Sequence, residues 1–556
     1  MWKLQGKKRE LCSHCVSEDD SDGPLKGVCH CCKSDNVELT LLDLYSGCGG
    51  MSTGLCLGAQ LSGLNLVTKW AVDSDKAACE SMKLNHTETQ IRNESADDFL
   101  DLLKEWERLC RCYAVGIGNQ RKHHIRASHI NVSNGDVQDD SMASEEFEVS
   151  RLVDICYGDP TSVGKRGLKF KVRWKGYGPS EDTWEPIEGL SNCEESIRNF
   201  VIEGFKSKIL PRPGEVDVVC GGPPCQVCEG YTSTICIEPI SSHELPSKAW
   251  NNGCGLLWPS SISFACNLPQ FPLPTHEVIL RGGASAEFER NVVGYDEGQV
   301  RVLEKAIVLK DVLSDLPAVS NEENNDQMPY TKGPQTEFQR YIRTPKSEMI
   351  GLAACEVEET KSMLFDHRPR KLFEDDYLRV CQIPRKKGAN FRDLPGLIID
   401  ANNTVQLDPT KKRTLLPSGK PLVPDYALNF WEGKSLRPFG RLWWDETMPT
   451  VLTVPDAHHQ VVLHPEQDRV LTIREIARLQ GFPDYYRFFG TVKERYRQIG
   501  NAVAVPVGKA LGYAMGLAWL KQSGDEPLMT LPSNFAFSYK VPQLSTSSSE
   551  VQNMSS

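Results

Sequence analysis

Long apolar runs and a secretory signal are both missing from this chain of 556 residues. The longest apolar stretch, 510–520, is far shorter than the roughly 20 residues that a membrane-spanning helix needs. The first ten residues carry several charges, and no apolar segment follows them as one would in a secretory signal. These absences exclude a membrane-spanning protein and predict an intracellular one.

An excess of positive charge is missing as well, because 63 Lys and Arg residues face 74 Asp and Glu residues, a formal charge of −11. This balance argues against a uniformly basic surface, although a local basic cleft could still hold nucleic acid. Hydrophobic residues at 40% and charged residues at 25% are ordinary values that exclude a wholly disordered, collagen-like or coiled-coil chain. A chain of this length is expected to form several domains.

The twenty cysteines are expected to be mostly reduced thiols, because the chain is predicted to be intracellular. Residues 1–37 hold a C-x-x-C followed by a C-x-C-C cluster, formed by Cys12, Cys15, Cys29, Cys31 and Cys32. Zinc binding is one interpretation of this cluster. The segment is polar and has no second C-x-x-C, which favours a disordered segment with free thiols and no metal.

Residues 38–112 have the pattern of an α/β nucleotide-binding sheet. An apolar strand at 38–44 runs into the loop Tyr-Ser-Gly-Cys-Gly-Gly at 45–50, and a helix follows at 52–61. A second strand at 69–72 ends at Asp73, and helices at 76–84 and 96–109 continue the alternation. A helix directs free N–H groups at such a glycine loop, and an acid about 20 residues further on is placed to bind ribose hydroxyls.

An insertion separates this segment from the next strand of the sheet, which is predicted at 215–220. The gap is much longer than a crossover between parallel strands requires. We expect a polar linker at 113–146 and a small domain at 147–205. This domain has an alternating strand at 168–174, a Gly-Tyr-Gly-Pro turn, and a closing helix whose apolar residues recur at helical spacing: Ile197, Phe200, Val201 and Phe205.

The rest of the chain divides by composition. The sheet resumes at 206–226, an atypical segment fills 227–266, and a loop-rich region with scattered basic groups covers 267–460. Compact helix and strand patterns return at 461–520. The Ser-rich tail at 521–556 is expected to be disordered.

The sharpest motif is the strand that ends in Gly-Gly-Pro-Pro-Cys-Gln at 221–226. Two prolines fix φ directly before Cys225, so its thiol is held on a stiff loop at the carboxyl end of a strand, which suits a nucleophile. A free cysteine is more often a small buried hydrophobe, but so specific a sequence disfavours that alternative.

Four segments in order resemble the signature of DNA (cytosine-5)-methyltransferases: LLDLYSGCGG at 41–50, GGPPCQ at 221–226, REIARLQGFP at 474–483 and QIGNAVAVP at 498–506. The inserted domain is similar to a chromodomain, so the chain resembles a plant chromomethylase over roughly 38–226 and 267–520. The resemblance implies an α/β fold, in which a Rossmann-like S-adenosylmethionine-dependent methyltransferase sheet carries an inserted small chromodomain and a loop-rich target-recognition lobe.

Carried over by position, the resemblance implies a cofactor site and a nucleophile. S-adenosyl-L-methionine would be held by the glycine loop, by two acids and by the closing motif, that is by Tyr45, Gly47, Gly49, Gly50, Asp73 at the ribose, Asp97 at the adenine, Asn501 and Val503. Cys225 would add to C6 of a cytosine extruded from double-stranded DNA, and basic groups of the recognition lobe would contact phosphates. Arg478 and Gln480 either help to order that lobe or stabilise their own helix.

Phe147, Trp174 and Tyr177 match by position the aromatic cage of a chromodomain. Such a cage would bind methylated lysine of a histone H3 tail, since a quaternary ammonium over aromatic faces gains up to roughly 2 kcal/mol when desolvated. The peptide can also add as a strand to an exposed edge. The resemblance therefore implies a nuclear protein that acts on chromatin.

The sequence departs from this family after the PCQ loop. We find neither the Glu-Asn-Val whose glutamate would hold the cytosine nor the Gln-x-Arg-x-Arg, and Glu323-Asn324 follows no strand. The 40 residues at 227–266 leave room for little more than one β-α-β unit, which takes about 30 residues. We interpret this segment as a gene-model fault, so the sheet is expected to be incomplete as written. Because 37 residues precede the first strand, we do not expect the family's BAH domain within them.

Two alternatives stay open at this point. The first is a catalytically inactive chromatin reader, since loss of one positioned acid or base commonly costs about 10² to 10⁴ in rate. The second is a dehydrogenase that uses the glycine loop. It is disfavoured because Ser52 stands where the third glycine of G-x-G-x-x-G would be.

Overall fold

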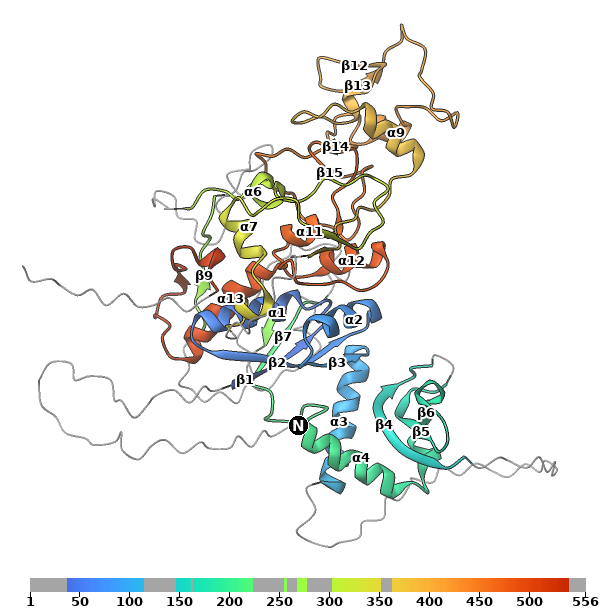
Figure 1. The fold of residues 1–556 in the computed structure, drawn as a ribbon, viewed down its shortest axis with the longest axis vertical. Helices are drawn as coiled ribbons and strands as arrows, with labels where there is room; N and C mark the ends of the chain where they lie inside the picture. Colours follow the sequence, from blue (N-terminus) through green and yellow to red (C-terminus); the bar gives the residue numbers. More distant parts are fainter. Residues whose placement is uncertain are drawn as a thin grey trace, which may run out of the picture. The chain divides into compact units, whose positions relative to one another are not determined.

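A computed structural model describes residues 38–114, 147–161, 164–223, 255–257, 268–277, 303–351 and 363–539 (Figure 1). The described residues form two compact units. The first unit comprises the described residues from 92 to 216. The second comprises residues 38–91 and the described residues from 217 to 539.

The second unit is built on a sheet whose described strands have the order β3-β2-β1-β7-β8. These strands are β1 (Glu38–Leu44), β2 (Asn65–Asp73), β3 (Gln90–Asn93), β7 (Val218–Gly221) and β8 (Gly255–Leu257). β1 pairs in parallel with β2 and with β7, and β8 pairs antiparallel with β7. The order β3-β2-β1-β7 is that of one half of a doubly wound sheet, which confirms the predicted fold class.

β1 lies in the middle of this sheet. Its sequence, ELTLLDL, places apolar residues at neighbouring positions and not only at alternate ones, which suits a strand covered on both faces. Leu39, Leu41 and Leu42 are buried accordingly. The central position of β1 fixes the loop that follows it at the carboxyl edge of the sheet.

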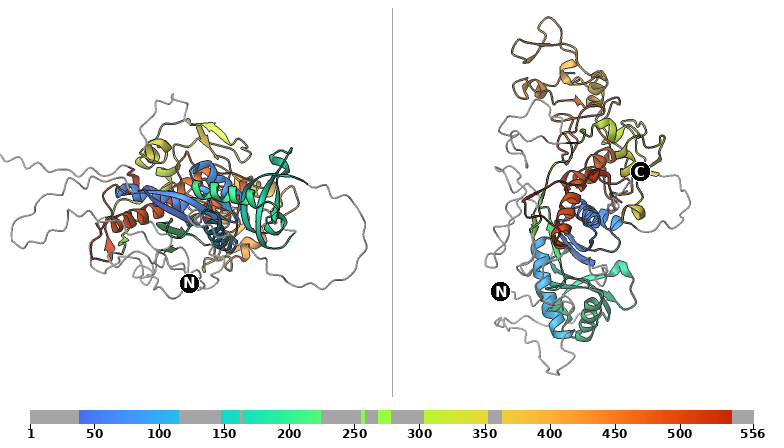
Figure 2. Two further views of the ribbon diagram at one scale, coloured as in Figure 1. Left: turned by 90° about the horizontal axis from the view of Figure 1, so that it is seen from below. Right: turned by 90° about the vertical axis from the view of Figure 1, so that its left-hand side faces the viewer.

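Two glycine-rich helices, α1 (Gly50–Leu61) and α13 (Val505–Trp519), pack closely against each other (Figures 1 and 2). Each has glycine at every fourth position, at 50, 54 and 58 in α1 and at 508, 512 and 516 in α13, so the glycines line one face of each helix. A Cβ on Gly58 would lie 1.9 Å from the carbonyl oxygen of Lys509, and one on Gly512 would lie 2.2 Å from that of Leu55. Glycine is therefore required where the two backbones meet.

One stretch of the described residues, Val492–Trp519, is long and apolar enough to span a membrane. It contains two helices, α12 (Val492–Asn501) and α13, and half of its most apolar part is buried inside the protein. The glycine contacts of α13 identify it as a core helix.

The rest of the second unit surrounds two further hydrophobic cores. One core involves α6 (Leu309–Leu313), α7 (Glu337–Ile342), α11 (Ile473–Leu479) and α12. The other lies in a lobe built mainly from residues 372–463, which contains α9, β12 and β13 (Figure 1). The remaining elements are short: α2 (Lys76–Asn85), β9 (Phe271–Pro272), β10 (Gln327–Pro329), α8 (Lys346–Met349), β11 (Met363–Phe365), α9 (Glu374–Gln382), η5 (Phe391–Asp393), β12 (Leu397–Ile399), β13 (Val405–Leu407), α10 (Asp425–Asn429), β14 (Gly440–Arg441), β15 (Val461–Leu463), β16 (Leu528–Met529) and η6 (Phe535–Phe537).

The first unit combines a three-stranded antiparallel sheet with two helices. Its strands, in the order β4-β5-β6, are β4 (Val149–Gly158), β5 (Gly167–Trp174) and β6 (Thr183–Pro186). Its helices are α3 (Ala96–Tyr113) and α4 (Glu194–Ser207). Two 3-10 turns, η1 (Pro179–Glu181) and η2 (Ile187–Leu190), connect β5 to α4 by way of β6.

Helix α3 groups with this first unit. The sequence predicted it as the last helix in the first part of the methyltransferase core, and that domain boundary stays a prediction. Trp106 of α3 meets Phe200 of α4 edge-on at 6.5 Å, and Phe200 meets Phe170 of β5 at 5.7 Å. A Cβ on Gly204 would lie 2.8 Å from the Trp106 ring. Alternation of strands and helices could not predict this, because an apolar helix face does not specify which partner covers it.

Candidate functional site

The glycine loop after β1 adopts left-handed backbone at alternate positions. Tyr45, Gly47 and Gly49 have φ of 56°, 54° and 90°, and Gly49 is the N-cap of α1. A Cβ on Gly49 would lie 2.7 Å from the Tyr486 hydroxyl and 3.2 Å from Nε2 of His86. Both backbone angle and space thus demand glycine at this position.

Asp73, at the end of β2, is joined to this loop. Its Oδ2 accepts a hydrogen bond from the N–H of Gly47 at 2.8 Å, and its Oδ1 accepts one from the N–H of Asp75 at 2.7 Å. Burial raises the pKa of Asp73, and the backbone hydrogen bonds oppose that rise. The structure therefore brings the predicted ribose ligand and the glycine loop together.

The closing motif packs on the start of α1. A Cβ on Gly50 would lie 2.6 Å from the carbonyl oxygen of Val503. Asn501 is the last residue of α12, and the chain then turns towards α13. This brings the end of the motif beside the loop, although about 450 residues separate the two in the sequence.

Gln480 holds that turn in place. Its side-chain Nε2 donates to the backbone carbonyl oxygens of Ile499 and Ala502 at 3.0 and 3.2 Å. Its backbone carbonyl oxygen accepts from the N–H of Val505 at 2.9 Å. Its side chain thus supports the closing motif.

Arg478, two residues earlier, lies wholly inside the core. Its guanidinium donates to carboxylates of Asp315 and Asp484, with the shortest contact of each at 2.6 Å. These contacts match the alternative in which Arg478 stabilises its own surroundings.

A network beneath the loop was not predicted. The Tyr486 hydroxyl donates to the carbonyl oxygen of Cys48, and Nε2 of His86 lies 3.1 Å from that hydroxyl and from Oγ1 of Thr53. Burial lowers the pKa of His86 to about 4, so the ring is neutral at physiological pH. No sequence motif places Tyr486 near residue 48, because the contact crosses more than 400 positions.

Asp43 of β1 is a second unpredicted feature. It is fully buried, and neither of its carboxylate oxygens hydrogen-bonds to a described residue. Burial raises its pKa to about 7, and the neighbouring Ser52 and Cys220 side chains offset that rise only in part. The Oγ of Ser46, in the loop just after β1, is likewise buried without a hydrogen-bond partner among the described residues.

β7 carries the chain towards the predicted nucleophile. Leu44, the last residue of β1, stands opposite Gly221, the last residue of β7. A Cβ on Gly221 would lie 2.7 Å from the carbonyl oxygen of Leu44. The glycine loop and the Pro223 loop therefore leave the sheet side by side. Cys225 lies outside the described residues.

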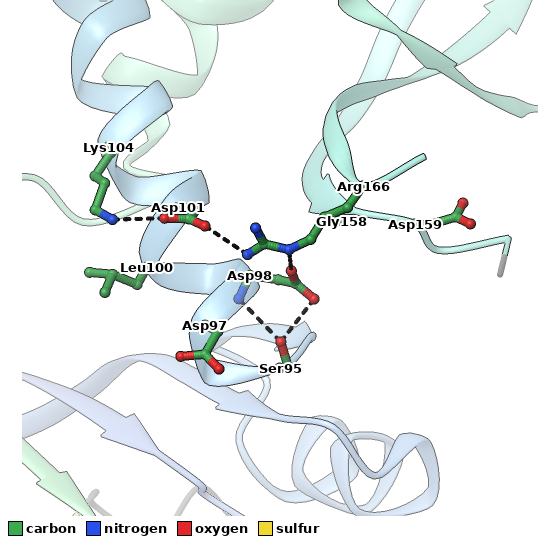
Figure 3. A pocket seen from close by; sticks show the side chains of 9 residues that line it. All are labelled: Ser95, Asp97, Asp98, Leu100, Asp101, Lys104, Gly158, Asp159 and Arg166. Carbon is green, nitrogen blue, oxygen red and sulfur yellow. Dashed lines mark hydrogen bonds and ion pairs between the residues drawn. The ribbon is translucent and has the colours of Figure 1, made fainter. Parts of the chain in front are cut away.

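Asp97, the predicted adenine ligand, lies in the first unit, in the first turn of α3. It lines an open pocket of about 710 Å³ between α3 and the β4–β5 connection (Figure 3). In that pocket the Arg166 guanidinium bridges Asp98 and Asp101 at 2.6 and 2.7 Å. The role predicted for Asp97 stays a prediction.

The three predicted cage residues lie together in the first unit. The Phe147 ring is 5.9 Å from that of Trp174 and 6.0 Å from that of Tyr177, with interplanar angles of 61° and 63°. Phe147 and Tyr177 are 52% and 49% exposed. The Trp174 ring is fixed by a 3.0 Å hydrogen bond from Nε1 to Oγ1 of Thr183. Steeply inclined, exposed rings of this kind can surround a quaternary ammonium group.

No group of three or more potential metal ligands occurs among the residues that the structure describes. The cysteine cluster at 12–32 lies outside them.

Comparison with known proteins gives two family matches and several close relatives. The C-5 cytosine-specific DNA methylase family matches residues 316–517, and the Chromo (CHRromatin Organisation MOdifier) domain matches residues 147–202. The chain is 52% identical to DNA (cytosine-5)-methyltransferase CMT2 of Oryza sativa subsp. japonica, over 91% of this chain and 42% of that protein. It is 52% identical to CMT2 of Arabidopsis thaliana, over 98% of this chain and 46% of that protein.

The similarity extends to DNA (cytosine-5)-methyltransferase CMT3 of Arabidopsis thaliana, with 47% identity over 92% of this chain and 68% of that protein. The chain thus spans less than half the length of the two CMT2 relatives and about two thirds of CMT3.

Proposed function

Because the chain belongs to the chromomethylases, a family of DNA (cytosine-5)-methyltransferases, we propose that it transfers a methyl group from S-adenosyl-L-methionine to C5 of cytosine. Its substrate is double-stranded DNA in nuclear chromatin that carries methylated lysine on histone H3. The proposal has a catalytic part in the second unit and a reading part in the first.

One observation carries the catalytic part. β1 and β7 are parallel neighbours that end in register at Leu44 and Gly221. Ligands of open α/β sheets bind outside the carboxyl ends of the strands. The glycine loop and the segment that leads from β7 to Cys225 both begin at that edge of the sheet. This arrangement supports a cofactor and a nucleophile in one site.

The residues at this edge fit S-adenosyl-L-methionine. A Cβ on Gly47 would meet no atom within 4 Å, so the space beside the loop is open to a ligand. Asp73 can accept from the ribose hydroxyls with lone pairs beyond its two backbone contacts. Tyr45, Gly49 and Gly50 would complete the cradle, with Asn501 and Val503 closing it. When bound, this cofactor supplies an electrophilic methyl group.

Cys225 is the proposed nucleophile. Its thiolate adds to C6 of the extruded cytosine, forming the S–C6 bond and moving the C5–C6 π electrons onto C5, which then takes the methyl group. Removal of the C5 proton by a base restores the double bond, breaks the S–C6 bond and releases the thiolate. Extrusion of the base costs a few kcal/mol, which phosphate contacts from the recognition lobe offset.

The reading part is the cage of Phe147, Trp174 and Tyr177. The inclination and exposure of the rings support capture of a methylated lysine. A second candidate function follows from this cage together with the missing Glu-Asn-Val. In that alternative, the chain binds methylated histone tails but does not transfer methyl groups.

The test uses labelled S-adenosyl-L-methionine with duplex DNA, and a second duplex containing 5-fluorocytosine. Fluorine on C5 cannot leave as a proton does, so the covalent adduct persists and is seen on a denaturing gel. Cys225→Ala should abolish both the label and the adduct. Cys381→Ala, which removes an exposed cysteine of the recognition lobe, should change neither.

Absence of both signals with intact binding of methylated peptide would favour the reader alone. Sequencing the transcript across residues 226–268 separates a reader from a gene-model fault. A recovered Glu-Asn-Val segment should restore the adduct. A repaired chain that still forms none would overturn the methyltransferase proposal.

A further inference from the structure

The turn after α10 holds an exposed tryptophan against an arginine. Trp431 is 61% exposed, and the guanidinium carbon of Arg437 lies 4.8 Å from the centroid of its ring. Within the described residues Arg437 forms no ion pair, whereas Arg385 and Arg413 of the same lobe each pair with an aspartate. The aromatic face keeps the planar guanidinium group in one position. Its N–H donors are therefore available to hydrogen-bond to a ligand outside the chain.

The backbone of this turn is strained and firmly held. Trp431, Glu432 and Gly433 have consecutive φ values of 51°, 54° and 74°, which bulky residues rarely adopt. The carbonyl oxygen of Gly433 accepts from Nη2 of Arg392 at 2.8 Å and from the N–H of Val405 in β13 at 3.1 Å. Such strain persists only where surrounding contacts enforce it, and it concentrates at functional sites.

The segment of the lobe around this turn is basic although the chain is acidic. Residues 385–437 contain ten Lys and Arg but five Asp and Glu, in a protein of net charge −11. A locally positive segment is complementary to nucleic acid. This charge, and an arginine without an acidic partner in the part of the chain that the structure describes, favour DNA over a hydrophobic protein surface as the occupant.

Contacts link the turn to the catalytic part of the unit. Phe430 meets His459 at 5.4 Å, and His458 lines a pocket of about 510 Å³ together with Arg370, Lys371 and Thr453. The segment that lines this pocket runs against α12, since a Cβ on Gly500 would lie 2.6 Å from the backbone of Leu452. A duplex seated across this pocket can reach the turn.

We propose that Trp431 and Arg437 read a base edge of the DNA near the target cytosine, and so set the sequence context of methylation. Arg437 donates two hydrogen bonds, the fork that matches O6 and N7 of guanine. Trp431 holds the fork in one plane. This inference rests on the proposed function, because it requires duplex DNA as the substrate.

The test measures binding of labelled duplexes that differ only in the base pairs flanking one cytosine, at fixed salt. Arg437→Lys keeps the charge but loses the fork. This variant should reduce the ratio of affinities between the most tightly and the most weakly bound duplex by about tenfold. Its affinity for the most weakly bound duplex should change little. Trp431→Ala and the milder Trp431→Phe should shrink the ratio in the same direction. Arg385→Lys is the matched control and should leave the ratio unchanged.

Each result decides a specific point. A ratio that survives in Arg437→Lys and Trp431→Phe, or equal weakening of all duplexes, overturns base reading. So does the absence of any preference in the parent chain. If the parent chain binds no duplex at all, the proposed function itself fails. Retained binding of methylated peptide and an unchanged melting temperature show that each variant is folded.

Discussion

The backbone N–H of Gly47 donates to Oδ2 of Asp73 at 2.8 Å, which ties the loop after β1 to the end of β2. The residue proposed to bind the ribose is therefore also the residue that shapes the cradle. Its removal should weaken cofactor binding in two ways, by losing the ribose contact and by releasing the loop.

Asp73→Ala is expected to reduce the affinity for S-adenosyl-L-methionine at least about tenfold, because an unsatisfied donor and a lost charged hydrogen bond each cost about 1–3 kcal/mol. Isothermal titration calorimetry measures this change. Asp73→Asn, which keeps one acceptor, should fall between Ala and the parent. Glu80→Gln, on the exposed side of α2, is the control. Parental affinity in Asp73→Ala would remove Asp73 from the site.

Trp174→Ala should abolish measurable binding of a histone H3 peptide that carries methylated lysine. The ring supplies one wall of the cage, and cation–π contact with a desolvated ammonium is worth about 2 kcal/mol. Fluorescence anisotropy with methylated and unmethylated peptides measures the effect. Lys175→Ala alters the next residue, whose ammonium pairs with Glu148 at the surface, and should bind as the parent does. Unchanged affinity in Trp174→Ala would disprove the cage.

Gly58→Ala should lower the free energy of unfolding by about 1–3 kcal/mol, as overpacking commonly does. The added Cβ would lie 1.9 Å from the carbonyl oxygen of Lys509, and backbone atoms of α13 cannot move aside singly. The better helix propensity of alanine, roughly 1 kcal/mol, acts in the opposite direction. Gly333→Ala, where a Cβ meets nothing within 4 Å, serves as control in urea denaturation. Equal stability of the two variants would contradict the packing of α1 on α13.

Arg478→Ala should destabilise the fold by about 3 kcal/mol, the low end for a broken buried ion pair. The buried carboxylates of Asp315 and Asp484 lose the guanidinium that contacts both of them, while Arg343 stays paired with Asp315 and Arg474 lies 4.0 Å from Asp484. Arg497→Ala breaks a pair with Asp75 in which the arginine side chain is 45% exposed, and should cost at most about 1 kcal/mol. Thermal and urea unfolding compare the two. A similar loss in both variants would refute a structural role for the buried cluster.

Asp43 should make stability depend on pH. Burial raises its pKa in the folded protein to about 7, above the unfolded value near 3.9. Between these two pH values the folded protein holds a proton on Asp43 that the unfolded chain has released. The contribution of Asp43 to the free energy of unfolding is therefore complete below about pH 4 and is lost as pH rises to 7. The full loss is bounded at about 4 kcal/mol.

Asp43→Asn should therefore flatten the fall in unfolding free energy between pH 5 and pH 8, measured by urea denaturation at several pH values. Glu80→Gln should leave the slope as in the parent chain. If the slope survives in Asp43→Asn, another group causes it.

Local sequence predicted the strand, glycine loop and helix at 38–61, because apolar runs, glycines and helical spacing are determined by neighbouring residues. The same holds for the sheet around Trp174 and for helix α4. The resemblance to methyltransferases further selected Asp73 and Val503 for one site, and they do lie near the loop. The partner of α3 could not be predicted in this way. Trp106 indicates an apolar face on this helix, but nothing in the local sequence predicts that Phe200 covers it.

The glycines at 50, 54 and 58 and at 508, 512 and 516 are a signal in the sequence for close helix packing. Two helices with small residues at every fourth position can approach closely, and such a match across 450 residues would have predicted the contact of α1 with α13. By contrast, no pattern marks Tyr486 or His86, whose hydrogen bonds depend on where separate loops end.

The sequence by itself determined the local elements, the aromatic trio and the family, because each depends on residue types at fixed short spacings. Only the tertiary structure decided that Val503 closes on Gly50, that Asp43 is buried without a hydrogen-bond partner among the described residues, and that the turn at 431–433 is held by Val405 of β13. Those relationships arise when distant backbones pack, and burial and strain then depend on what surrounds a residue, which spacing along the chain does not record.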